Sequence, residues 1–99
     1  MAKRPLTTVR RGPFVTTLLK YPGKGGWTFA PIPKALAPPV TRAWGRTPVR
    51  AVVDGQEWET SVWRDSRTDR SLLAVPARIR GSKKPGERVT VELTFDAED

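Results

Sequence analysis

Arginine is the residue type with the greatest capacity for binding chemistry in this chain of 99 residues. Its planar guanidinium group binds phosphate and carboxylate groups through paired hydrogen bonds. The chain has 18 Lys and Arg residues against 10 Asp and Glu residues, which gives a formal net charge of +8 at pH 7. Such an excess favours anionic partners, and it also keeps a protein soluble. The basic residues form two groups, Arg42, Arg46 and Arg50 in the first, and Arg64, Arg67, Arg70, Arg78, Arg80, Lys83 and Lys84 in the second.

These two groups form a phosphate-binding surface if they converge on one face of the fold, and they only confer solubility if they are scattered. The sequence leaves both arrangements open.

Tryptophan is the second residue type of interest, since the chain has four. Buried tryptophan supplies apolar area to a small core, whereas exposed tryptophan stacks on a base, a sugar or a peptide side chain. Trp58 and Trp63 differ in parity along a predicted strand, so they should point to opposite faces. We therefore expect Trp63, beside Arg64, to lie outside the core. An alternative ligand pocket would be lined by Trp27, Phe29, Trp44 and Trp58.

Residue types suited to catalysis are sparse. The chain has no cysteine and no histidine, which excludes a thiolate nucleophile, a Ser-His triad and the commonest metal ligands. Glu57 and Glu59 share one face of a predicted strand and could act as a carboxylate pair, but neighbouring glutamates on an outer sheet face are usually solvated. We therefore predict no catalytic residue, no metal and no cofactor. As a function, a hydrolytic enzyme ranks third, after binding of a polyanion and binding of a small ligand or peptide.

The element that positions many of these residues is a predicted hairpin over residues 48–63. Asp54-Gly55 suits a two-residue type I′ turn, in which both central residues need a positive φ. Apolar residues alternate with polar ones on both sides of this turn, so one face of the hairpin should be core and the other wet. The predicted core face carries Val49, Ala51, Val53, Trp58, Thr60 and Val62.

Four further strands are predicted, over residues 14–20, 27–32, 71–75 and 88–95. Because prolines 38 and 39 break a long helix, we expect only a short one, with Leu36, Val40 and Trp44 plugging one end of a barrel. Residues 76–81 are predicted to form a single helical turn with Ile79 facing inward.

One domain over residues 13–95 is predicted, between a flexible basic arm at 1–12 and an acidic tail at 96–99. No apolar run approaches the ~20 residues of a membrane span, and no signal peptide is visible. We therefore expect a cytoplasmic protein without membrane contacts, either a monomer or a weak dimer.

Four short motifs follow one another along the chain. They are Gly26-Trp27-x-Phe29-x-x-x-Pro33, Pro48-Val49-x-Ala51-x-Val53-Asp54-Gly55-x-x-Trp58-x-Thr60-Ser61-Val62, Leu73-x-Val75-x-x-x-Ile79-Arg80 and Gly86-Glu87-x-Val89-x-Val91-x-Leu93. Over about residues 13–95 this order resembles a small bacterial family of domains of unknown function, also found joined to bacteriocin-protection-like domains. The resemblance implies a partly open β-barrel of the double-split type, as in transition-state regulators and antitoxins of the AbrB kind. It implies no activity, and the Pro38-Pro39 pair departs from the polar residues more usual at the start of that family's helix.

The sequence thus predicts an all-β fold, a small six-stranded split, partly open β-barrel with one short helix capping an end. We expect a non-enzymatic binding module for nucleic acid or another polyanion, acting through the surface arginines Arg42, Arg46, Arg50, Arg64, Arg67, Arg78 and Arg80 and through Trp63. The alternative is a barrel that binds a small ligand or a peptide in a tryptophan-lined pocket.

Overall fold

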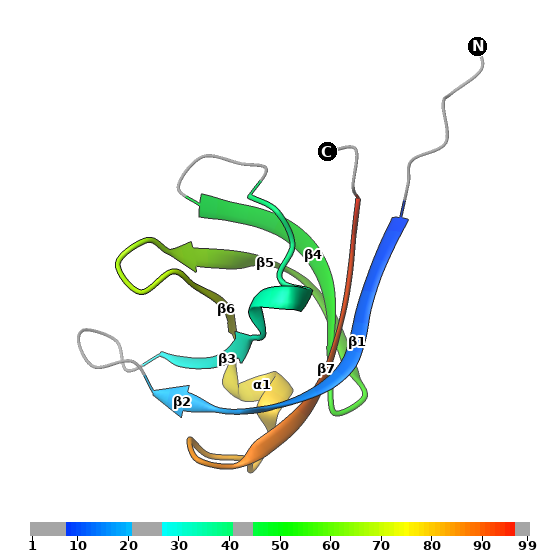
Figure 1. Cartoon of the computed structure of the whole chain (residues 1–99). Coiled ribbons are helices and arrows are strands. Elements are labelled where there is room, and N and C mark those ends of the chain that lie inside the picture. Colours follow the sequence, from blue (N-terminus) through cyan, green and yellow to red (C-terminus); the bar gives the residue numbers. More distant parts are fainter. Residues whose placement is uncertain (1–7, 21–26, 41–44, 97–99) are drawn as a thin grey trace.

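The computed structural model describes residues 8–20, 27–40 and 45–96, and within them one antiparallel sheet curls on itself into an open barrel (Figure 1). The strand order across the sheet is β1-β7-β4-β5-β6-β3-β2. Its two edge strands, β1 and β2, are separated in the sequence only by Leu18. The sheet must therefore curl until its two edges lie close together. The all-β open barrel is therefore confirmed. The strands of the described residues are β1 (Thr8–Thr17), β2 (Leu19–Lys20), β3 (Thr28–Ile32), β4 (Arg46–Val53), β5 (Gln56–Asp65), β6 (Arg70–Ala74) and β7 (Arg88–Asp96).

The predicted central hairpin is present as β4 and β5, with Val53 opposite Gln56 across the turn. Asp54 and Gly55 have φ values of 47° and 85°, as a type I′ turn requires. The turn is also tied to β7, because the Asp54 amide donates to the Thr90 carbonyl oxygen and the Thr90 amide donates to Asp54 Oδ1, both at 2.9 Å. This hairpin therefore sets the register of β7 as well as its own.

The core lies on the concave face of the sheet, where the apolar residues of the alternating patterns meet. Val91 and Leu93 of β7 are fully buried, and Trp58 of β5 is 9% exposed. The inward parity predicted for the hairpin and for the last strand is confirmed. The buried core residues are Leu18, Ala30, Ile32, Val49, Ala51, Val53, Trp58, Val62, Leu73, Val75, Ile79, Val89, Val91, Leu93 and Phe95.

The first predicted strand is longer than expected and is interrupted. It begins at Thr8 instead of Phe14, so residues 8–11 of the predicted arm pair with β7, and residues 1–7 lie outside the described part of the chain. It breaks at Leu18, whose amide donates to the Glu87 carbonyl oxygen at 2.9 Å and whose side chain is 1% exposed. This break divides one predicted strand into β1 and β2, which is why the sheet has seven strands among the described residues instead of six.

The helix expected over Leu36, Val40 and Trp44 does not form in its described part. A single 3-10 turn, η2 (Lys34–Leu36), ends at Ala37, where the backbone is extended with φ −69° and ψ 137°. Pro38 and Pro39 cannot donate helical hydrogen bonds, and a proline disfavours helical geometry in the residue before it, so the chain continues extended. Trp44 lies outside the described residues.

One short helix, α1 (Ala77–Arg80), follows β6, where the sequence predicted a single turn. Ile79 faces the core and is 6% exposed, as predicted. The helix ends at Gly81, whose φ of 62° suits glycine at a helix C-terminus.

Candidate functional site

Trp63 lies on the outer face of the sheet, as its parity predicted. Along β5, Val62 is buried at 2% exposure, and the next residue, Trp63, is 42% exposed. Trp63 is opposite Leu72 of β6, and Leu72 is opposite Pro31 of β3. These three residues form an apolar row across three strands on the side of the sheet that faces away from the core.

Two more aromatic residues lie on this outer face, and this is where the structure departs from the predicted pocket. Trp27 is 60% exposed and Phe29 is partly exposed, while Trp58 is buried on the opposite face. Trp58 therefore does not share a cavity with Trp27 and Phe29, because its position along β5 directs its side chain to the core side of the sheet. The fourth residue of the predicted pocket, Trp44, is not among the described residues.

Trp27, Phe29 and Trp63, here called the aromatic patch, line one cavity of about 420 Å³. Its floor is apolar, since Leu72 and Ala74 line it between the rings. Leu72 points outward but is only 4% exposed, which shows that this part of the outer face is covered instead of bare. The pairing of β3 with β6 and of β6 with β5 places residues from three separate segments around this cavity.

Three of the predicted arginines surround the aromatic patch. Arg64 and Arg67 line the cavity itself. Arg46 is opposite Trp63 in the pairing of β4 with β5, and its guanidinium carbon lies 6.0 Å from the Trp63 ring centroid. This distance is at the limit of a cation–π contact. The structure thus combines part of the predicted arginine set with part of the predicted tryptophan set in one place.

Arg50 is on the same strand as Arg46 but is engaged elsewhere. Its guanidinium forms ion pairs with Glu57 at 3.2 Å and with Glu59 at 2.8 Å. The hydrogen bond to Glu59, and then the charge of Glu57, raise the pKa of Arg50 above its ordinary value. Glu57 and Glu59, considered above as a catalytic pair, are exposed and bound to an arginine on an outer strand face. Arg50 therefore has little charge available for a phosphate.

Arg78 and Arg80 lie on α1, at the end of β6 opposite to Arg67 and Arg64. The five residues of β6 span roughly 16 Å. Arg80 donates to the Val75 carbonyl oxygen at 3.3 Å, so it also supports the end of the strand. The predicted arginines consequently divide into a group at the aromatic patch and a group at α1, and Arg42 lies outside the described residues.

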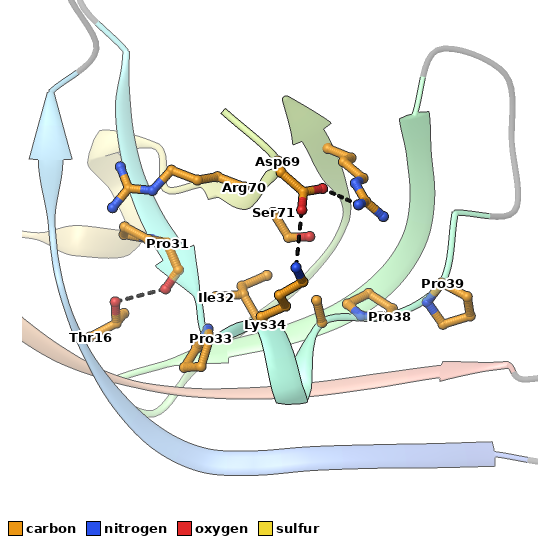
Figure 2. Close-up of a pocket in the computed structure, with 12 residues that line it drawn as sticks. Thr16, Pro31, Ile32, Pro33, Lys34, Pro38, Pro39, Asp69, Arg70 and Ser71 are labelled. Carbon is orange, nitrogen blue, oxygen red and sulfur yellow. Dashed lines mark hydrogen bonds and ion pairs between the residues drawn. The ribbon is translucent and has the colours of Figure 1, made fainter. Parts of the chain in front are cut away.

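A second cavity, of about 610 Å³, opens at one end of the barrel, and we refer to it as the barrel mouth (Figure 2). Its charged lining residues are Lys34, Arg64, Asp69 and Arg70. The Lys34 ammonium group lies 3.2 Å from Asp69 Oδ2, and Arg64 forms an ion pair with Asp69 Oδ1. The hydrogen bonds from Arg64 and then from Lys34 lower the pKa of Asp69. Arg64 lines both cavities and so lies between them.

Nothing in the sequence singled out the barrel mouth, because Lys34 and Asp69 meet only through the adjacency of β3 and β6. In the pairing of β3 with β6, Ile32 is opposite Ser71, and continuing this antiparallel register places Lys34 opposite Asp69. Both strands were predicted, but their adjacency was not. Residues 34 and 69 are far apart in the sequence, so only the strand order brings them together.

Neither a metal site nor a membrane span is found within residues 8–20, 27–40 and 45–96. No group of three or more Asp, Glu, His or Cys residues in these ranges could hold a metal ion. None of the helices in the same ranges is long and apolar enough to cross a membrane.

Comparison with protein families gives a match to a domain of unknown function (DUF1905) over residues 14–93. The chain belongs to this family. The matched range includes both cavities and every strand, apart from the first residues of β1 and the last of β7. Neither the curated proteins nor the solved structures gave a match. The resemblance inferred from the four motifs is confirmed as to the family, whose description names no activity.

Proposed function

We propose that this protein is a binding module for single-stranded nucleic acid, with bases stacked on the aromatic patch and phosphates held by Arg46, Arg64 and Arg67. The observation that carries the proposal is the exposure of two tryptophans over one cavity, with Trp27 at 60% and Trp63 at 42%. A large aromatic side chain loses favourable burial when it remains in water, so two of them side by side on an outer face favour a binding role.

A single strand fits this surface better than a duplex does. Bases of a single strand are free to stack on aromatic rings, and each stacked base contributes about 1–3 kcal/mol. In a duplex the base faces are occupied by neighbouring base pairs, and a protein meets mainly grooves and backbone. The aromatic patch offers ring faces and an apolar floor of Leu72 and Ala74, which suits flat apolar groups.

The arginines around the patch supply the charge that a nucleic acid backbone needs. Among the described residues, neither Arg46 nor Arg67 forms an ion pair with a carboxylate, although Asp65 also lines the cavity and accepts a hydrogen bond from the Arg67 amide at 3.0 Å. Arg64 is paired with Asp69 and contributes less. Cations beside stacking rings are the arrangement by which sequence-tolerant single-strand binding proteins follow a backbone.

Fluorescence anisotropy with short labelled oligonucleotides at ~50 mM salt tests the proposal, since non-specific nucleic acid binding is strong at low salt. We expect the single strand to bind more tightly than the matching duplex. Trp63→Ala should weaken single-strand binding by roughly 5- to 150-fold, the equivalent of one stacked base. Trp63 is exposed, so this variant should fold like the parent.

The matched control compares two exposed arginines of the described chain. Arg67→Ala removes a charge at the patch, and Arg78→Ala removes one at α1. We expect only Arg67→Ala to weaken binding. Equal affinity for parent and Trp63→Ala, or no binding at micromolar protein, would refute the proposal.

A peptide or small ligand is the second candidate occupant of the same cavity. Its volume of about 420 Å³ lies within the range of small-molecule sites, and its floor is apolar. An apolar occupant would bind with little dependence on salt, because no counterions are released from it. Salt-insensitive binding of a hydrophobic peptide, together with no binding of oligonucleotides, would favour this second candidate.

A further inference from the structure

The barrel mouth is a candidate site distinct from the aromatic patch. Its volume of about 610 Å³ is in the range of small-molecule pockets. The two cavities share Arg64, while Lys34 and Arg70 line only the barrel mouth and Trp63 lines only the other. Each cavity can therefore be tested through residues that the other does not use.

Positive charge dominates the lining of the barrel mouth. Lys34, Arg64 and Arg70 come from three different elements, η2, β5 and β6, and converge on one cavity. They carry three positive charges against the single negative charge of Asp69, which leaves a net charge of +2 among the described lining residues. Asp69 is ionised at neutral pH even at the ordinary pKa of an aspartate, and Arg64 and Lys34 lower that pKa further.

Arg70 is the cation in this cavity that is free to take a ligand. No carboxylate of the described residues forms an ion pair with it. Figure 2 shows its side chain extending toward Pro31, away from the ion pair between Lys34 and Asp69. Arg70 and Lys34 therefore supply positive charge at two separate points of the lining, Arg70 near Pro31 and Lys34 beside Asp69.

The rest of the lining is mostly apolar and fixed in position. Ile32 and Pro38 are buried, and Pro31 is held by its carbonyl oxygen, which accepts a hydrogen bond from Thr16 Oγ1 at 2.7 Å. Proline rings and an isoleucine side chain offer a rigid surface to the apolar part of a ligand. The site thus has a cationic side and an apolar side.

We propose that the barrel mouth binds a small phosphate monoester, with the phosphate on the cationic side, which Lys34, Arg64 and Arg70 line, and the organic part against Pro31, Ile32 and Pro38. A phosphate monoester carries a charge of about −1.5 to −2 at pH 7, which complements the net charge of the lining better than a carboxylate does. One arginine guanidinium also binds two phosphate oxygens at once, through two parallel hydrogen bonds. This proposal does not depend on nucleic acid binding at the aromatic patch.

Isothermal titration of the full chain with phenyl phosphate tests the proposal, with benzoate as a monoanion of similar shape. We expect phenyl phosphate to bind at least about fivefold more tightly than benzoate, and Arg70→Ala and Lys34→Ala each to weaken phenyl phosphate about fivefold or more. Both side chains are exposed, so neither variant should affect folding. Arg78→Ala, which removes an equal charge at α1, should leave this affinity unchanged.

Trp63→Ala separates this site from the aromatic patch. It should leave phenyl phosphate binding unchanged even where it weakens oligonucleotide binding, because Trp63 does not line the barrel mouth. Three outcomes would overturn the proposal. They are no binding of phenyl phosphate up to about 10 mM, equal binding of benzoate, and equal loss of affinity in Arg78→Ala and Arg70→Ala.

Discussion

Gly12 is the glycine at which the backbones of β1 and β7 lie closest together. It has a φ of 98°, and a Cβ atom added there would lie 2.7 Å from the Val91 carbonyl oxygen. Gly86 has the same φ, and a Cβ atom there would meet nothing within 4 Å. An alanine at either position would therefore carry the cost of a positive φ. Of the two, only an alanine at Gly12 would also clash with backbone atoms.

This pair gives a matched test of close packing. Gly86→Ala should lower the free energy of unfolding by about 1–2 kcal/mol, from the left-handed conformation alone. Gly12→Ala should lower it by about 1–3 kcal/mol more, because the Val91 carbonyl group or β1 must shift. Urea unfolding of both variants measures the difference. Equal destabilisation would show that β1 does not approach β7 as closely as the structure indicates.

Asp69 is the residue for which the structure predicts a pH effect. Arg64 and Lys34 lower its pKa in the folded state. A carboxyl group with a lowered folded pKa contributes stability above its unfolded pKa, and that contribution is lost as the pH falls through the folded pKa.

Asp69→Asn should therefore unfold at a slightly lower temperature than the parent at pH 7. The difference should shrink below about pH 4 and disappear once Asp69 is protonated. It should be small at every pH, since these ion pairs are exposed to solvent. Thermal unfolding of both proteins between pH 7 and pH 2 measures it. A difference that stays constant over this range would contradict the ion-pair account.

Among the elements, β7 is the strand on which the barrel most depends. It pairs with β1 on one side and with β4 on the other, and its Val89, Val91 and Leu93 are all at most 2% exposed. An aspartate on its inner face would be a buried charge without a partner, which costs several kcal/mol.

Val91→Asp should therefore prevent cooperative folding, as followed by circular dichroism during heating. Val15→Asp is the matched control, because Val15 is a strand valine that is 57% exposed. It should change the free energy of unfolding by less than about 1 kcal/mol. A soluble, cooperatively folded Val91→Asp protein would show that the inner face of β7 is not core.

For the molecule as a whole, the net charge of +8 is not equivalent to a binding surface. Arg50 is occupied by Glu57 and Glu59, and Arg78 and Arg80 lie at α1, away from the aromatic patch. Among the described residues, Arg46, Arg64 and Arg67 are the arginines that surround the proposed nucleic acid site. Binding should therefore respond to these three positions and not to total charge.

The salt dependence of oligonucleotide binding distinguishes binding through these three arginines from binding through the total charge. With ~3 phosphate contacts on a single strand, the slope of log K against log salt should be about −2. Arg67→Ala should reduce the slope by about 0.7, while Arg78→Ala should leave it unchanged. Anisotropy titrations from about 50 to 200 mM salt provide the slopes. An equal change in both variants would mean that overall charge, and not the patch, drives binding.

Much of the secondary structure was determined by the sequence alone, because it depends on neighbours in the chain. The Asp54-Gly55 turn needs only two residues that tolerate a positive φ, and both have it. The alternation from Val89 to Phe95 sets the inner face of β7 without reference to any other strand. Parity also placed Trp58 inside and Trp63 outside.

The arrangement of the candidate sites was decided only by the tertiary structure. The strand order β5-β6-β3 brings Trp27 and Phe29 beside Trp63, and the β3–β6 register brings Lys34 to Asp69. Outside hairpins such as β4–β5, residue spacing carries no information on which strands will be neighbours, since that depends on how the whole sheet curls to bury one core. The sequence could therefore identify the tryptophans and arginines as candidate binding residues. The curl of the sheet and the register of its strands determined which of them lie together.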